Sequence, residues 1–213
     1  MDKWLTTNLG LFVDGARQVG KTYILKKYGK EHFKKFIYIN LIEQKDYVDV
    51  LSESKNANDF ILRLRTLVSE EMPLHETCIF IDEIQEFQDF DIVTIMKFLV
   101  EEGSYRFMLS GSLLGIALYN VNSWPVGYMA TYTMHPLTFF EYAKNRGMQE
   151  DTYRELEINI KNKKVLPEYL HKKFLEIFDE YMIIGGMPQI VDSFISNNDI
   201  SNLDVYYDAI NSL

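Results

Sequence analysis

The hydrophobic residues of the chain fall into short runs separated by stretches with a helical repeat. Five runs are rich in apolar, β-branched and aromatic residues and predict strands, at 9–13, 36–41, 77–83, 105–109 and 129–137. The third run is almost continuously apolar until it ends in two carboxylates, as expected for a buried strand of a parallel sheet. The fifth alternates with polar residues, which is typical of a strand at a sheet edge.

The stretches between these runs carry apolar residues at helical spacing. We predict helices at 22–28, ended by Gly29, at 58–71, with Asn58 as N-cap, and at 90–102, ended by Gly103. Strands that alternate with helices imply parallel βαβ units with helices on both faces of the sheet. The predicted fold class is therefore α/β, a three-layer sandwich around a parallel five-stranded sheet.

The pattern changes after residue 137, where no further strand is visible. We expect helices at 138–146, 167–184 and 189–196, a charged helix and loop at 151–164, and a last segment from Asn202. This predicts a core domain at 1–146 followed by a small all-helical domain at 147–213. The chain stops at Leu213 without a polar tail, so we expect the helical domain to be truncated at its C-terminal end.

Composition narrows the possible classes of protein. The 213 residues are 47% hydrophobic and 25% charged, which is typical of a soluble globular protein. No apolar stretch reaches the roughly 20 residues of a membrane span, and no secretory signal is visible. Cys78 is the single cysteine, so no internal disulfide can form and we expect a cytoplasmic location. The net charge of −9 argues against a large nucleic-acid surface, and basic pairs such as Lys26-Lys27 are typical of a solvated helix face.

The first strand runs into Gly15-Ala16-Arg17-Gln18-Val19-Gly20-Lys21-Thr22, which matches the phosphate-binding loop pattern G-x-x-x-x-G-K-[ST] at every fixed position. Glycines allow the backbone to curl with its N–H groups inward, where they and the helix N-terminus cradle phosphates. Lys21 would supply charge to the phosphate oxygens, and the Thr22 hydroxyl would ligate Mg²⁺. The alternative is a chance glycine-rich turn, but the order of strand, loop and helix favours the phosphate site.

The third strand ends in Asp82-Glu83, at the edge where a parallel sheet binds its ligands. Asp82 would hold Mg²⁺ directly or through water, and Glu83 would polarise the attacking water. An ordinary strand followed by a solvated acidic turn is the alternative. The phosphate loop upstream favours the catalytic interpretation, because phosphoryl transfer needs mainly position and charge from the protein.

Several segments together resemble a known family. They are the phosphate loop at 15–22, Phe-Ile-Asp-Glu-Ile-Gln at 80–85, Ser-Gly-Ser-Leu-Leu-Gly at 110–115, Pro-Val-Gly at 125–127, His-Pro-Leu-Thr-Phe-Phe-Glu-Tyr at 135–142 and Gly-Gly-Met-Pro at 185–188. In this order they resemble the bacterial and archaeal AAA-type P-loop ATPases whose C-terminal half is a domain of unknown function. The resemblance implies a P-loop core, a helical lid and a further domain after residue 213.

The resemblance also assigns roles to single residues. Ser110 resembles the sensor residue that hydrogen-bonds the attacking water or the γ-phosphate, although a polar turn that closes a strand would look the same. Pro188 resembles the lid residue near the adenine, with a simple helix break as the alternative. We include Tyr23, which follows the loop, among the nucleotide-binding residues. No arginine follows Pro188 or stands near residues 125–127, so no arginine finger can be assigned, and slow turnover is expected.

These observations predict an ATP-binding module that depends on Mg²⁺, with weak ATP hydrolysis. It would act as a nucleotide-controlled switch for an attached domain or a protein partner, and self-association stays open. Two alternatives remain, a small-molecule P-loop kinase and a DNA-associated motor or repair ATPase. The scattered arginines argue against the kinase and the net charge against the DNA motor. ATP rather than GTP rests on the resemblance, because no Asn-Lys-x-Asp guanine-reading motif is present.

Overall fold

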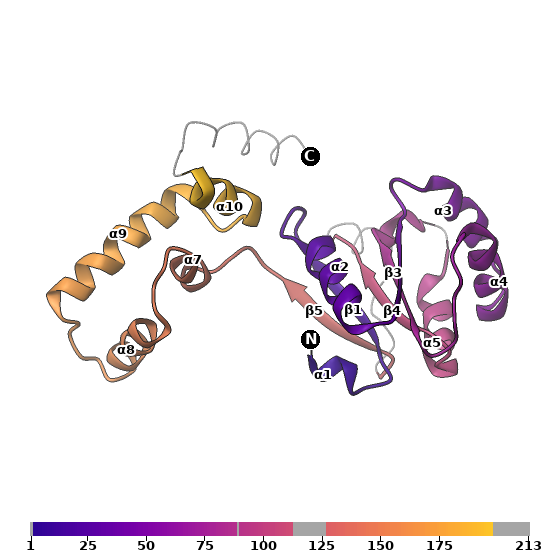
Figure 1. Ribbon diagram of the computed structural model, residues 1–213, viewed down its shortest axis with the longest axis horizontal. Helices are drawn as coiled ribbons and strands as arrows, with labels where there is room; N and C mark the ends of the chain where they lie inside the picture. The colour runs from indigo at the N-terminus through magenta and orange to yellow at the C-terminus, as the bar shows by residue number, and fades with distance from the viewer. Residues whose placement is uncertain (1, 89, 113–126, 198–213) are drawn as a thin grey trace. The chain divides into compact units, whose positions relative to one another are not determined.

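The computed structural model describes residues 2–88, 90–112 and 127–197 (Figure 1). The chain divides into two compact units, Met1–Met134 and His135–Leu213. The division falls at the end of the fifth strand, ahead of the boundary that the sequence pattern predicts after residue 146. The helix at 138–146 is therefore grouped with the second unit.

The first unit is built on a five-stranded sheet whose strands are all parallel. Its order is β2-β3-β4-β1-β5, so β1 lies between β4 and β5 although it comes first in the chain. The strands are β1 (Gly10–Gly15), β2 (Lys35–Asn40), β3 (Thr77–Asp82), β4 (Arg106–Ser110) and β5 (Met129–Met134). All five predicted strands are confirmed, and β5 occupies an edge as its alternating pattern indicated.

Hydrophobic clusters cover both faces of this sheet. Leu11 and Val13 of β1 join the cluster that contains Leu25 of α2 (Lys21–His32), whereas Phe12 joins the cluster under α4 (Ala57–Leu67) and α5 (Ile92–Glu102). Successive side chains of a strand point to opposite faces, so β1 contributes to both layers of core. The predicted three-layer α/β fold is confirmed (Figure 1).

Several ends of the predicted helices are wrong. Helix α4 ends at Leu67 and not at 71, and α5 begins at Ile92 and not at 90. Helix α2 does not end at Gly29 but continues to His32. Gly29 lies against the ring of Phe36, where a Cβ atom would overlap the aromatic carbons, so packing requires the glycine inside the helix. The N-cap of α4 is Asn56 and not Asn58, since the Asn56 side chain accepts a hydrogen bond from the backbone N–H of Asp59 at 3.0 Å. Gly103 ends α5 in the left-handed conformation, as predicted.

Three short elements of the first unit carry little sequence signal. They are α1 (Asp2–Leu5), α3 (Lys45–Ser52) and the single 3₁₀ turn η1 (Ile84–Glu86). Helix α1 is fixed by Arg106, whose guanidinium donates to the backbone oxygens of Trp4 and Thr7 and lies 4.5 Å from the Trp4 ring centroid. A half-buried cation therefore satisfies carbonyl groups that the helix end leaves without intrahelical partners.

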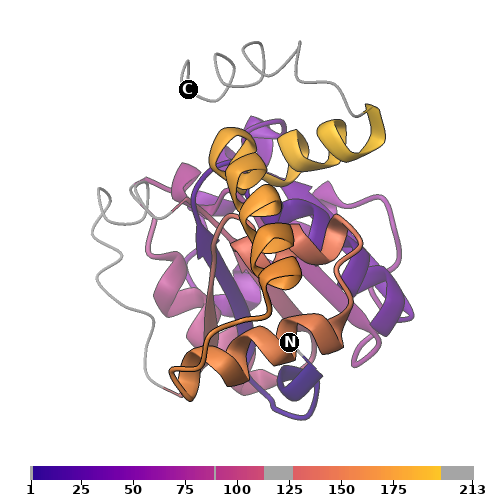
Figure 2. The same cartoon turned by 90° about the vertical axis from the view of Figure 1, so that its left-hand side faces the viewer.

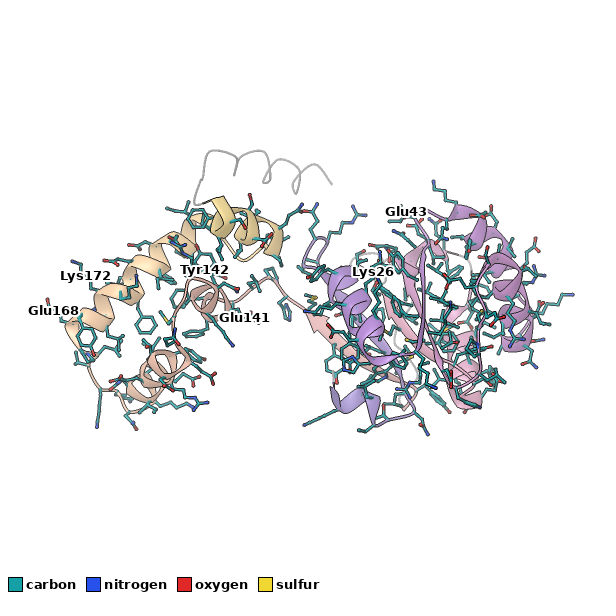
Figure 3. All side chains as sticks on the ribbon, in the orientation of Figure 1. Lys26, Glu43, Glu141, Tyr142, Glu168 and Lys172 are labelled. Carbon is teal, nitrogen blue, oxygen red and sulfur yellow. The ribbon has the colours of Figure 1, made fainter. Side chains whose placement is uncertain are left out.

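The described part of the second unit is helical, as predicted (Figures 1 and 2). It comprises α7 (Phe139–Asn145), α8 (Glu150–Lys161), α9 (Glu168–Ile184) and α10 (Pro188–Asn197). Thr138 and Glu141 form a capping box at the start of α7. Tyr142 anchors the core of this unit and donates a 2.5 Å hydrogen bond to Glu180 of α9 (Figure 3). The segment predicted from Asn202 lies outside the described residues.

A search of the described helices for one long and apolar enough to cross a membrane found none.

Candidate nucleotide site

The glycine-rich segment connects the carboxyl end of β1 to the first turn of α2, as the motif requires. Its backbone is unusual at three positions, with φ of 140° at Gly15, 62° at Gln18 and 93° at Gly20. A side chain at Gly15 would overlap the backbone oxygen of Met134, to which Gly15 is paired in the sheet. The loop is therefore curled, and its first glycine is required by both its φ angle and its close approach to β5.

Lys21 lies inside this loop and is almost fully buried, with 6% of its surface exposed. Its ammonium donates hydrogen bonds of 2.9 and 2.7 Å to the backbone oxygens of Gly15 and Ala16. Burial lowers the pKa of Lys21, and the negative charges of Glu83 and Asp82 oppose that shift. The lysine is thus held at the loop with carboxylates nearby, in a position to exchange its carbonyl partners for phosphate oxygens.

Asp82 ends β3 and is the centre of the polar network, with 2% of its surface exposed. Its Oδ2 accepts a 2.6 Å hydrogen bond from the Thr22 hydroxyl, and its Oδ1 accepts from the Ser110 hydroxyl and from the Glu83 N–H. The first turn of α2 and the ends of β3 and β4 therefore meet at one carboxylate. Four predicted site residues are in direct contact here.

Tyr38 of β2 is a member of this network that the sequence analysis missed. Its hydroxyl donates a 3.2 Å hydrogen bond to Oδ2 of Asp82. Burial, followed by the charge of Asp82, raises the pKa of Tyr38. The tyrosine stands three positions before the end of the strand predicted at 36–41, but the sequence does not say which strand lies beside β3.

Glu83 follows Asp82 in the left-handed conformation, with a φ of 60°. A non-glycine residue in this region is uncommon and is often found at functional sites. Its carboxylate accepts a hydrogen bond from the Gln85 side-chain amide, and the Gln85 side-chain oxygen accepts from the Ser112 N–H at 3.4 Å. Gln85 thus links Glu83 to the segment after β4, a role that the sequence analysis also missed.

The other predicted binding residues have different surroundings. Ala16, Arg17 and Gln18 are exposed on the loop, whereas Val19 is fully buried beneath it. Tyr23 lies on α2 and is 73% exposed. None of the hydrogen bonds described above for Asp82 involves Tyr23. Pro188 begins α10 in the second unit, so its predicted place near an adenine stays a prediction. Residues 113–115 and 125–126 of the family-like segments lie outside the described residues.

The donors gathered at Asp82 are hydroxyl and carboxylate oxygens, the ligands that Mg²⁺ prefers. The described ranges contain no group of three or more His, Cys, Asp or Glu side chains that could hold a metal by themselves. Magnesium at a phosphate-binding loop is usually held by one or two protein oxygens, with phosphate oxygens and water completing the coordination. The side chains of Thr22 and Asp82 fit such a site.

The parallel sheet, the curled loop and the carboxylate at the end of β3 together define a P-loop nucleotide-binding fold. A comparison with protein families agrees with this class, because residues 7–143 match the model of the AAA domain. The chain belongs to this family, and its first unit is a nucleotide-binding ATPase module of the AAA type. A search of the curated proteins found no match for the chain.

Solved structures with similar folds include the Drosophila ORC bound to DNA, at 16% identity over 87% of this chain and 53% of that chain, with a TM-score of 0.48. C. elegans PCH-2 is 11% identical over 91% of this chain and 55% of that chain, with a TM-score of 0.46. The Aeropyrum pernix ORC1 protein in complex with DNA is 11% identical over 79% of this chain and 59% of that chain, with a TM-score of 0.42. The chain spans little more than half the length of these proteins, and similarities this distant carry no argument about function.

Proposed function

We propose that the first unit binds ATP together with Mg²⁺ and hydrolyses it slowly, and that its nucleotide state controls an attached domain or a protein partner. The observation that carries this proposal is the 2.6 Å hydrogen bond between Thr22 and Asp82. It joins the residue after the loop lysine to the carboxylate at the end of β3. The two halves of a phosphate site are thus brought together across 60 residues of sequence.

Binding follows from the loop. The buried ammonium of Lys21 and the backbone N–H groups at the start of α2 offer positive charge to the β- and γ-phosphates. Thr22 and Asp82 would hold Mg²⁺ through oxygen, and the ion when bound would neutralise charge on the phosphates. The arrangement of Lys21, Thr22 and Asp82 supports this assignment.

Hydrolysis needs a water molecule aligned with the γ-phosphate. We assign its orientation to Glu83, whose carboxylate takes up the proton as the water oxygen bonds to phosphorus. The bond between the γ-phosphorus and the bridging oxygen then breaks, and ADP and inorganic phosphate leave. We assign the sensing of the γ-phosphate to Ser110, and the hydrogen bond from its hydroxyl to Asp82 supports this assignment.

We infer slow turnover because three of the four arginines of the first unit bind groups away from the phosphate loop. Arg63 pairs with Glu53 and Asp59, Arg65 donates to the Tyr105 hydroxyl, and Arg106 binds the backbone of α1 and the residues after it. Arg17, exposed on the loop, is the remaining arginine of that unit. An arginine at the γ-phosphate accelerates related reactions by about 10³–10⁵-fold. A partner or a second copy of the chain that supplies one would therefore raise the rate, which makes the switch responsive to assembly.

The test is nucleotide binding and turnover by two variants. Lys21→Ala should weaken ATP binding by on the order of 100-fold, since it removes a buried charge from the phosphate site. Glu83→Gln should bind ATP like the parent and release no phosphate above background. Binding is measured with a fluorescent ATP analogue in the presence of Mg²⁺, and turnover by phosphate release.

Lys27→Ala is the matched control, because Lys27 is an exposed lysine on the same helix. It should leave both measurements unchanged. If Lys21→Ala and Glu83→Gln both bind ATP like the parent and hydrolyse it at the same rate, the site assignment is wrong.

A further inference from the structure

The carboxylate of Asp82 accepts hydrogen bonds from four donors, two on each oxygen. Ser110 and the Glu83 N–H share Oδ1, and Thr22 and Tyr38 share Oδ2. Three of these donors belong to the predicted nucleotide site. Tyr38 does not, and it comes from β2, which pairs with β3 and lies at an edge of the described sheet.

The ring of Tyr38 is held on several sides. It packs against Phe80 of β3 with ring centroids 5.3 Å apart, and the ammonium of Lys26 lies 3.4 Å from the Tyr38 ring centroid. Lys26, labelled in Figure 3, is on α2, one turn after Thr22. Tyr38 is therefore fixed by the same helix that carries the loop lysine and Thr22, and its hydroxyl has little freedom to leave Asp82.

We propose that Tyr38 is a positioning residue for Mg²⁺, which acts by holding Oδ2 of Asp82 beside the Thr22 hydroxyl. This inference rests on the proposed function. Ser110 and the Glu83 N–H hold Oδ1, so without Tyr38 the Thr22 hydroxyl would be the one described donor on Oδ2. The terminal torsion of an aspartate is broad, and a second donor on Oδ2, on a ring packed against Phe80 and Lys26, narrows the positions that this oxygen can take.

The role predicts a specific defect when the hydroxyl is removed. Hydrogen bonds to metal-ligating carboxylates typically change metal affinity by about 10–100-fold. Tyr38→Phe keeps the ring, its packing on Phe80 and its contact with Lys26, and loses only the donor to Asp82. We call the Mg²⁺ concentration that produces half of the full change in nucleotide affinity the Mg²⁺ midpoint. We expect this midpoint to rise about tenfold. Nucleotide binding without metal should not change, because Lys21 and the loop are untouched.

The experiment uses the full chain and the methylanthraniloyl derivative of ADP as fluorescent probe. Its affinity is measured in EDTA and then at increasing Mg²⁺, for the parent and for Tyr38→Phe. Tyr47→Phe is the matched control, since the Tyr47 hydroxyl donates to the backbone oxygen of Leu67 at 2.7 Å, away from Asp82. The control should reproduce the parent in both conditions, and circular dichroism checks that both variants fold.

The outcomes separate this inference from the proposed function. If the parent binds no nucleotide, or binds it with no response to Mg²⁺, the proposed function fails first. If the parent responds to Mg²⁺ and Tyr38→Phe responds at the same concentration, the positioning role is refuted. An equal loss of affinity in EDTA and in Mg²⁺ also refutes it, because the tyrosine would then only support the fold of the loop.

Lys26→Met provides a second variant, with Lys27→Met as its control. Lys26→Met keeps a chain of similar length over the ring but removes the charge. A cation over an aromatic ring contributes about 0.5–1 kcal/mol at an exposed site, so we expect the Mg²⁺ midpoint to shift about two- to fivefold in the same direction. Lys27 is exposed on α2, and Lys27→Met should leave the midpoint unchanged.

Discussion

Replacing Gly15 by alanine tests whether the loop conformation is required for the fold as well as for phosphate binding. Gly15 has a φ of 140°, which a residue with a side chain rarely adopts. A Cβ atom there would also overlap the backbone oxygen of Met134 and lie 3.1 Å from its carbonyl carbon. Met134 is the register partner of Gly15, so relief of the overlap requires β5 to move away from β1.

The size of the effect follows from these two contributions. A side chain in a backbone conformation reserved for glycine costs about 1–3 kcal/mol, and an overpacked contact costs about 1–3 kcal/mol. Gly15→Ala should therefore lower the free energy of unfolding by about 2–6 kcal/mol, which is a large part of the 5–15 kcal/mol of a typical domain. Urea unfolding followed by far-UV circular dichroism measures the loss.

Gly103→Ala is the control that separates the two contributions. Gly103 also has a positive φ, of 72°, but nothing lies within 4 Å of the position that its Cβ would occupy. This variant should lose about 1–2 kcal/mol through the left-handed backbone conformation alone. If Gly15→Ala is no less stable than Gly103→Ala, the close approach of β1 and β5 does not constrain the loop and the reasoning is refuted.

Two further substitutions test contacts that the sequence did not reveal. Arg106→Met keeps the apolar stem but removes the donors to the backbone of Trp4 and Thr7. It should lower the free energy of unfolding, measured by urea unfolding, by about 2 kcal/mol. Unchanged stability would show that α1 does not need these hydrogen bonds. Gln85→Ala removes the donor to Glu83 and should slow phosphate release about tenfold with unchanged ATP affinity. A matching loss of affinity would place Gln85 in binding instead.

The strands and the phosphate loop were predictable because their signals are local. A buried parallel strand is a continuous apolar run, and the loop needs its glycines at fixed spacing whatever the rest of the chain does. The sequence analysis assigned Thr22 and Asp82 to the same Mg²⁺ ion, from the motif and from the rule that ligands bind at the carboxyl ends of parallel strands, and the two side chains are in contact. Ser110 came from the family resemblance, and its contact with Asp82 supports the assignment.

Helix ends were less predictable, because tertiary contacts compete with local preference. Gly29 has the propensity of a helix stop, yet α2 runs past it to His32. Only glycine leaves room there for the ring of Phe36, so a packing contact and not a helix end accounts for this residue. Asn56 and Asn58 are the same residue type, so their intrinsic preference for the N-cap position is equal. The structure selects Asn56, since its side chain reaches the N–H of Asp59.

The sequence by itself determined the class of this protein, through the spacing of loop residues and the alternation of strands and helices. The tertiary structure decided which side chains share the site. Tyr38 meets Asp82 because β2 pairs with β3 in parallel register, and Gln85 reaches the segment after β4 because η1 turns it there. Neither contact has a local signature, since strand order depends on packing across the whole sheet and not on the residues of any one strand.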